Sequence, residues 1–273
     1  MSIVRSKTSL EPTAPEASGH RESRNPAGEW ILILDRPRGG EENMLIDRRL
    51  LYDLESDPRP RSVLRLYAWK EPTISLGKHQ RTELAVDAQA CLQRGVPIVR
   101  RPTGGRAVLH ADELTYAVLS NDRRLFPRQG VLDTYRAIAR ALQHGLALAG
   151  VDCVLSRAPA AAKRKEPAPS PARGRQAPCF TSPNRYELLV DGRKIAGSAQ
   201  RRLRRAFLQH GSIPLSVDYA LMGELLAASP AVLRASLVSA GRAAARPLDF
   251  RQLAEALAQA FKMVFPGCWR QRR

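Results

Sequence analysis

The chain has 273 residues, of which 44% are hydrophobic and 26% charged, so it can bury a full core, and wholesale disorder is excluded. Its formal net charge of +18 predicts acidic partners, such as nucleic acid, an anionic membrane or acidic proteins. Because no apolar run is long enough to cross a bilayer and the N-terminus lacks the apolar core of a signal peptide, we expect a cytoplasmic protein that does not enter a membrane.

Composition divides the chain into a tail, a folded region and an insertion. Residues 1–28 are rich in Ser, Pro, Glu and Arg and have few large apolar side chains, which predicts a disordered N-terminal tail. Residues 29–273 are expected to form one domain. Within it, residues 157–176 become a basic stretch of Ala, Pro, Arg and Lys, which we expect to be a mobile insertion.

The first half of the chain alternates between strand and helix patterns. Strands are expected at residues 30–34, 63–69 and 72–77, and helices at residues 42–54 and 83–94. In the segment 63–69 the apolar residues Leu64, Leu66 and Ala68 lie on one face, which predicts a half-buried strand. The helix at 83–94 should be capped by Thr82 and end at Gly95.

The second half adds a hairpin and further helices. Helices are expected at residues 133–148, after 216 and at 248–264, and strands at 151–155 and 207–213. Residues 186–196 form a strong hairpin signal, because Asp191-Gly192 supplies the positive φ angles of a type I′ turn. Together these elements predict an α+β fold with a mainly antiparallel sheet and flanking helices.

Residues 100–110, Arg-Arg-Pro-Thr-Gly-Gly-Arg-Ala-Val-Leu-His, join two apolar strand-like runs through a glycine turn. Gly104 and Gly105 allow the backbone to approach a ligand, and Arg101 and Arg106 place cationic donors beside the turn. This arrangement suits an extended, partly anionic ligand; the alternative is a hairpin turn with solvated arginines. The stretch is neither a dinucleotide-binding fingerprint nor a P-loop.

The four cysteines, Cys91, Cys153, Cys179 and Cys268, are widely separated, so neither a zinc site nor a disulfide framework is indicated and no metal is expected. Cys179 lies in a proline-flanked loop after the basic insertion, where exposure and nearby cations favour a nucleophilic thiolate. The alternative is a small buried side chain, which we prefer for Cys91 and Cys153.

Lys194 and His110 are two further candidates for chemistry. Lys194 lies in the second strand of the hairpin, where its charge would stabilise a thiolate or an oxyanion, and the alternative is an ordinary solvated lysine. His110 would be a base or a polar wall of a binding site, although a single histidine in an apolar strand is more often a satisfied core residue. We assign it to binding.

Several motifs in the same order carry a resemblance to a known family. They are residues 100–110 with Glu113-Leu114-Thr115-Tyr116, residues 42–47, residues 67–77 and residues 192–200. From about Trp30 to the C-terminus, apart from the insertion, the chain resembles the biotin/lipoate protein ligase catalytic-domain family, in its lipoate and octanoate branch.

The resemblance implies an α+β acyltransferase domain. It would move an octanoyl group from acyl carrier protein to a lysine of a lipoyl domain, in 2-oxoacid dehydrogenases or the glycine cleavage H protein. It implies that Cys179 takes the acyl group and that Lys194 lies beside the acyl carbonyl. The substrate-binding residues would be Arg101, Gly104, Gly105, Arg106, His110, Gly197 and Ser198. Thioester chemistry needs no ATP, so no cofactor is expected.

Three other functions stay open. An ATP-dependent lipoate ligase is disfavoured because Arg106 stands where ligase members usually have a third glycine and because the segment beyond Ile213 is short for their accessory domain. A lipoyl or octanoyl amidotransferase would use the same cysteine chemistry. A nucleic-acid-binding protein would be expected to have aromatic residues among its basic ones, and aromatic residues are only 5% of the chain. Biotin attachment is disfavoured because the glycine-arginine loop of those members is missing.

The basic cluster Arg201, Arg202, Arg204 and Arg205 is expected to meet an acidic protein, or simply to aid solubility. Three features depart from the family pattern: the insertion before Cys179, Ala111 in place of an acid, and the Lys70-Glu71 pair.

Overall fold

The computed structural model describes residues 28–127, 130–156 and 186–272. The expected tail up to residue 27, the insertion at 157–176 and Cys179 lie outside the described residues. Among the helices of the described ranges, none is both long and apolar enough to span a bilayer.

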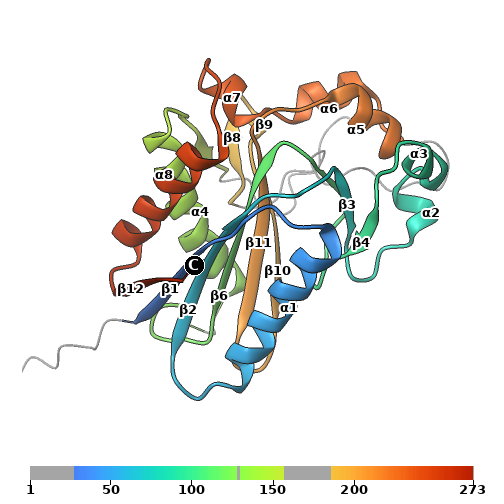
Figure 1. Ribbon diagram of the computed structural model, residues 1–273. Coiled ribbons are helices and arrows are strands. Elements are labelled where there is room, and N and C mark those ends of the chain that lie inside the picture. The colour runs from blue at the N-terminus through green and yellow to red at the C-terminus, as the bar shows by residue number, and fades with distance from the viewer. Residues whose placement is uncertain (1–27, 128–129, 157–185, 273) are drawn as a thin grey trace, which may run out of the picture.

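A six-stranded sheet forms the centre of the molecule (Figure 1). Its strands are β10 (Gly197–Arg202), β11 (Phe207–Pro214), β6 (Glu113–Ser120), β2 (Arg61–Tyr67), β1 (Glu29–Leu34) and β12 (Cys268–Arg272), in that spatial order. β1 is parallel to both of its neighbours, and the other three pairings are antiparallel.

Two smaller sheets flank this one. The first has the order β4 (Ile98–Arg100), β3 (Thr73–Leu76), β5 (Val108–His110), and the second the order β7 (Val154–Leu155), β8 (Leu188–Val190), β9 (Arg193–Lys194). Six of the nine pairings between these named strands are antiparallel, so the expected α+β fold with a mainly antiparallel sheet is confirmed.

Helices cover both faces of the central sheet. They are α1 (Gly40–Ser56), α2 (Thr82–Ala85), α3 (Ala88–Gln93), α4 (Val131–Leu148), α5 (Tyr219–Leu225), α6 (Pro230–Ser236), α7 (Ala240–Ala243) and α8 (Phe250–Val264). α4 and α8 pack together on one face and α1 lies on the other (Figure 1). The small β4-β3-β5 sheet has its own core with the short helices α2, α3, α5 and α6.

The long helices follow from apolar spacing and from their end signals. In α4, Ile138, Leu142 and Leu146 recur at helical spacing and are all buried, as expected. α8 begins with a capping box, because the Asp249 carboxylate accepts from the Gln252 amide and the Gln252 side chain accepts from the Asp249 amide. These helices therefore bury one apolar face each against the sheet.

The expected hairpin at 186–196 is present as β8 and β9. Asp191 and Gly192 have φ angles of 49° and 75°, the two positive values that a type I′ turn requires. The turn brings Lys194 opposite Leu189 and fixes where the Lys194 side chain starts.

Three expected elements are wrong in detail. The helix at 83–94 is two short helices, because the Asp87 carboxylate accepts from the Ala90 amide and starts a new helix. β2 is buried on both faces rather than half-buried, since helices cover both sides of the sheet, and Ala68 lies beyond its end. Only Val154–Leu155 of the segment 151–155 forms a strand, and Val154 is 63% exposed at the edge of its sheet.

The glycine turn does not close a hairpin. The strands before and after it, β4 and β5, both pair with β3, which runs between them. The turn therefore crosses over β3, and the Gly105 carbonyl oxygen comes so close to Gly77 that a Cβ there would lie 2.0 Å from it. This contact explains a requirement for glycine at position 77.

Candidate active site

A narrow cavity lies between the central sheet and the small β4-β3-β5 sheet, with a volume of about 30 Å³. It is lined from α1, β2, β3, β5, β6, β10 and β11, so segments that are far apart in the sequence meet there. Four of the predicted substrate-binding residues line it: Arg101, His110, Gly197 and Ser198. Gly104, Gly105 and Arg106 lie in the adjacent turn and are not among its lining residues.

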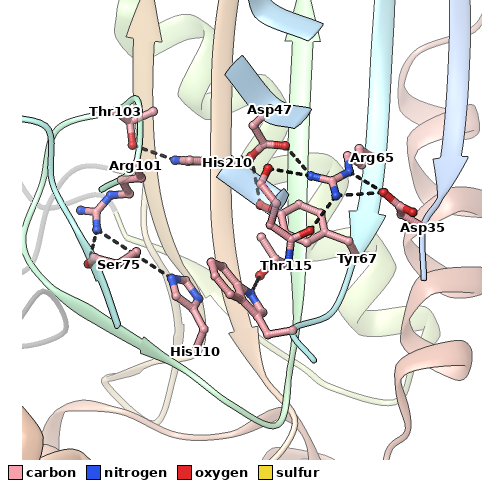
Figure 2. A network of polar contacts seen from close by, with 12 residues as sticks. Asp35, Asp47, Arg65, Tyr67, Ser75, Arg101, Thr103, His110, Thr115 and His210 are labelled. Carbon is pink, nitrogen blue, oxygen red and sulfur yellow. Dashed lines mark hydrogen bonds and ion pairs between the residues drawn. The ribbon is translucent and has the colours of Figure 1, made fainter. Parts of the chain in front are cut away.

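One wall of the cavity is a hydrogen-bonded chain of three side chains. Ser75 Oγ lies 2.7 Å from His110 Nε2 (Figure 2). On the other side of the ring, His110 Nδ1 lies 2.8 Å from Glu113 Oε1. The Glu113 carboxylate also accepts from Thr115 and Ser212 and, at 3.2 Å, from Trp69 Nε1. Burial alone would raise the pKa of Glu113, but the His110 ring and these donors lower it.

His210, which also lines the cavity, belongs to a second hydrogen-bonded chain of the same kind. Thr103 Oγ1 lies 2.7 Å from His210 Nε2, and His210 Nδ1 lies 2.9 Å from Asp47 Oδ2 (Figure 2). Burial lowers the pKa of His210, although Asp47 opposes this shift. A neutral His210 donates to Asp47 and accepts from the Thr103 hydroxyl, which ties the glycine turn to β11 and α1.

Asp47 continues this chain into a buried ion-pair cluster. Arg65, which is fully buried, donates to Asp47 at 2.8 Å and to Asp35 at 2.9 Å, and Tyr67 donates to Asp47 at 3.0 Å (Figure 2). Burial would raise the pKa of Asp47, but the hydrogen bond from His210 and the charge of Arg65 lower it. The cluster joins α1 to the central sheet.

The side chain of Arg101 supports the glycine turn by donating hydrogen bonds to backbone carbonyl oxygens. Its guanidinium donates to the carbonyl oxygens of Ser75, Gly104 and Arg106 at 2.7–3.1 Å and to Ser75 Oγ at 3.1 Å. The side chain is 5% exposed. The Arg101 guanidinium therefore holds the turn in shape. Arg106 is half-buried, and substrate binding by these two arginines stays a prediction.

Lys194 is buried, which contradicts its reading as an ordinary solvated lysine. Its Nζ lies 2.7 Å from Glu187 Oε1, and its carbonyl accepts from the Val238 amide at 2.9 Å. Glu187 therefore holds the ammonium group, and the Val238 amide holds the backbone of Lys194. Cys179, its predicted partner, lies outside the described residues.

Gly197 and Ser198 begin β10 and line the cavity, and their role in letting a ligand approach stays a prediction. Ser198 Oγ lies 2.6 Å from the Tyr116 hydroxyl. On the neighbouring strand, a Cβ on Gly211 would meet the Gly197 carbonyl oxygen at 2.3 Å and the Tyr116 ring at 2.7 Å. Glycine at 211 therefore keeps this wall of the site in place.

Cysteines 91 and 153 behave as buried structural residues, as preferred from the sequence. Burial raises the pKa of the Cys153 thiol to about 11 and also raises that of Cys91. Cys268 is exposed on β12. Within the described ranges no group of three or more His, Cys, Asp or Glu side chains is arranged to hold a metal ion.

Sequence reasoning missed several residues of the site, among them Asp47, Ser75, Glu113 and His210. Asp47, Ser75 and Glu113 lie within motifs that carry the family resemblance, but the sequence did not indicate their roles. His210 lies in β11 between Gln209 and Gly211, with Ser212 beyond, so the local pattern did not mark it as a site residue.

Comparison with known proteins identifies the family. The sequence profile of the lipoyl protein ligase A/B catalytic domain matches residues 40–262. The chain is 41% identical to octanoyltransferase LipM of Geobacillus kaustophilus over 183 residues, which are 67% of this chain and 64% of that protein. It is 38% identical to octanoyltransferase LipM of Kyrpidia tusciae over 240 residues, which are 85% of each chain. The match thus spans less than two thirds of the Geobacillus relative.

Solved structures support the same fold. A bi-partite lipoate protein ligase from Thermoplasma acidophilum superposes with a TM-score of 0.69 at 18% identity, over 90% of this chain and 87% of that one. Lipoate-protein ligase A bound with ATP gives the same score and identity, over 90% and 88%. With the profile match and the relatives above, the chain belongs to the lipoyl protein ligase A/B catalytic domain family.

Proposed function

We propose that this chain moves an octanoyl group from acyl carrier protein to a lysine of a lipoyl domain, through a thioester on Cys179. The cavity between the two sheets supports this most directly. Although many of its lining residues are polar, Ser75, His110, His210, Thr115 and their neighbours are hydrogen-bonded to protein groups. The cavity therefore offers a ligand mainly carbon surface, which suits a saturated acyl chain.

The cavity is too narrow for an octanoyl chain as it stands, so the chain must displace lining side chains. The hydrogen-bonded walls resist such movement. Met44 lines the cavity from α1 and has a flexible, unbranched side chain, so we expect Met44 to move.

The chemistry would proceed in two transfers. The Cys179 thiolate attacks the carbonyl carbon of the donor thioester, a new C–S bond forms, and the carrier thiol leaves as a thiolate that takes up a proton. The amine of the acceptor lysine then attacks the acyl-cysteine, the C–N bond forms, the amine loses a proton and Cys179 leaves. Lys194 Nζ is held 2.7 Å from Glu187 Oε1 at a buried position, and we assign its positive charge to the stabilisation of the oxyanion in both steps.

Partner recognition would rest on charge. Acyl carrier proteins and lipoyl domains are typically acidic, and the net charge of +18 favours their association with this chain. The relatives named octanoyltransferase LipM support the transfer of an octanoyl group.

The direct test is intact-protein mass after mixing the full chain with octanoyl-acyl carrier protein in the absence of ATP. We expect an octanoyl adduct that hydroxylamine removes and that Cys179→Ser lacks. Cys153→Ser, the matched control at a buried cysteine, should still form the adduct. No adduct, together with lipoyl-domain modification only when ATP and free lipoate are supplied, would overturn the proposal in favour of a ligase.

A further inference from the structure

The cavity between the two sheets opens at the edge of the central sheet. Among the described residues that line it, Gly197, Ser198 and Ala199 are the ones that are not buried, and all three belong to the edge strand β10. With an acyl chain in the cavity, the carbonyl carbon of that chain lies at this mouth. A protein that receives the acyl group must therefore bring its lysine here.

The length of a lysine side chain limits how far that protein can be from the mouth. Bonds of about 1.5 Å at tetrahedral angles carry the amine nitrogen about 6 Å from its Cα atom. Arg201 is two residues beyond Ala199 on β10, about 7 Å along the strand, and its side chain leaves the same face of the sheet. The surface around Arg201 is thus about one lysine length from the mouth.

Arg201 joins the mouth to the outer face of α1. Its guanidinium donates to the Tyr52 hydroxyl of α1 at 3.2 Å and to the Pro102 carbonyl oxygen of the glycine turn at 3.5 Å. Neither partner carries a negative charge. Arg202, by contrast, donates to Thr134 of α4 on the other face of the sheet. The basic cluster expected from the sequence is therefore divided between the two faces.

The outer face of α1 beside Arg201 combines apolar and basic side chains. Leu45 and Tyr52 lie two helical turns apart on one side of the helix and are 47% and 46% exposed. Arg48 and Arg49 lie between them and are exposed, and within the described ranges neither forms an ion pair. We call Leu45, Arg48, Arg49, Tyr52 and Arg201 the α1 patch.

The α1 patch has the chemistry of a protein-binding surface for an acidic partner. The exposed carboxylates of α1 lie in its first and last turns, so the middle of this face is positively charged. Tyrosine and arginine are enriched at protein interfaces, and arginines without a carboxylate partner attract an acidic surface. Nucleic acid fits less well, because the patch has one aromatic side chain, Tyr52, on which a base could stack.

We propose that the α1 patch is the docking surface for the acyl acceptor, an acidic protein domain that places its lysine at the mouth of the cavity. The inference rests on the proposed function, because that function makes a protein lysine the acceptor. It adds where the acceptor binds, and the reach of the lysine explains why this surface adjoins the mouth.

Charge reversal tests the patch. Arg48→Glu/Arg49→Glu reverses two charges on α1. Arg136→Glu/Arg140→Glu is the matched control, because it reverses two exposed arginines of α4 that likewise form no ion pair within the described ranges, on the opposite face of the sheet. Tyr52→Ala, which changes no charge, is a second patch variant in case the double variant fails to fold.

The measurements are the KM for a lipoyl domain and the rate at which octanoyl-acyl carrier protein forms the acyl-enzyme. We expect Arg48→Glu/Arg49→Glu to raise this KM at least about tenfold and Tyr52→Ala at least about threefold, with the rate of acyl-enzyme formation unchanged. The control should change neither quantity. An equal rise in KM for both double variants, no rise for the patch variants, or an equal loss in acyl-enzyme formation would overturn the inference.

Titration of Cys179→Ser with the unmodified lipoyl domain separates this inference from the proposed function, because binding needs no chemistry. Binding that Arg48→Glu/Arg49→Glu weakens and Arg136→Glu/Arg140→Glu does not supports the docking surface even if no octanoyl adduct forms. Octanoyl transfer by Arg48→Glu/Arg49→Glu at the wild-type KM would overturn the docking surface and leave the proposed function standing. Single-stranded RNA that binds the patch and that the lipoyl domain does not displace would also overturn it.

Discussion

Replacement of Asp47 by Asn tests whether the buried cluster holds the domain together. The Asp47 carboxylate is fully buried and accepts from Arg65 at 2.8 Å, from His210 at 2.9 Å and from Tyr67 at 3.0 Å. Asparagine keeps the shape but removes the charge. Its amide nitrogen donates hydrogen bonds instead of accepting them, so it would face either Arg65 or the Nδ1–H of His210, which are donors themselves. At least one of the three hydrogen bonds must therefore be lost.

Removal of one partner of a buried ion pair costs about 3–5 kcal/mol, because the other charge is left uncompensated. Arg65 keeps its contact with Asp35 at 2.9 Å, so we expect the lower end, about 3 kcal/mol. At about 2–4 °C per kcal/mol for a chain of this size, Tm should fall by about 6–12 °C.

The assay is thermal unfolding followed by circular dichroism, with Asp53→Asn as the matched control on the exposed side of α1. The control should change Tm by no more than about 2 °C. Because the folded-state pKa of Asp47 is lowered, its contribution is present above the unfolded value of about 3.9 and is lost as the pH falls. The difference between wild type and Asp47→Asn should therefore shrink toward pH 3, and equal Tm shifts for the two variants would refute the reasoning.

Three further predictions concern other buried groups. Lys194→Met should lower kcat for octanoyl transfer by about 10²–10³-fold, as measured by mass spectrometry of the acceptor. Lys262→Met, on the exposed side of α8, should leave kcat unchanged, and equal rates for the two variants would show that Lys194 takes no part in the chemistry. The pKa of His210 is lowered in the folded state, so the unfolded chain binds a proton more readily and the free energy of unfolding falls as the pH drops below about 6.5. His210→Gln should make the free energy of unfolding, measured by urea titration, depend less on pH. An unchanged pH dependence would argue against a neutral ring. A thiol reagent at pH 8 should modify Cys268 but not Cys153, and peptide mapping that finds Cys153 modified would contradict its burial.

The sequence predicts those helices and turns that are determined by residues close together in the chain. The apolar spacing of α8 and the Asp191-Gly192 turn each lie within one short segment, and both predictions are confirmed. β12 was missed because its partner is β1, more than 200 residues earlier. Its position depends on the stacking of Trp269 on Trp30, with ring centroids 4.6 Å apart, and no local pattern encodes that contact.

The same distinction applies to the site. Motif positions such as Arg101, His110 and Lys194 could be named from the sequence, but their partners could not. His210 and Asp47 are 163 residues apart, and only the closed sheet brings them to 2.9 Å. The burial of Lys194 likewise depends on Glu187 across the hairpin and on the segment around Val238.

The two carboxylate–histidine–hydroxyl chains explain how a cavity with polar walls can still bind an apolar chain. Each hydroxyl satisfies a histidine and each histidine a carboxylate, so little hydrogen-bonding capacity is directed into the cavity. The chain through Thr103 also fixes the glycine turn to α1 and β11 before any ligand arrives. A wall that is already ordered costs less entropy to bind against. Substitutions that loosen Asp47 or His210 should therefore weaken donor binding as well as the fold, because one network serves both.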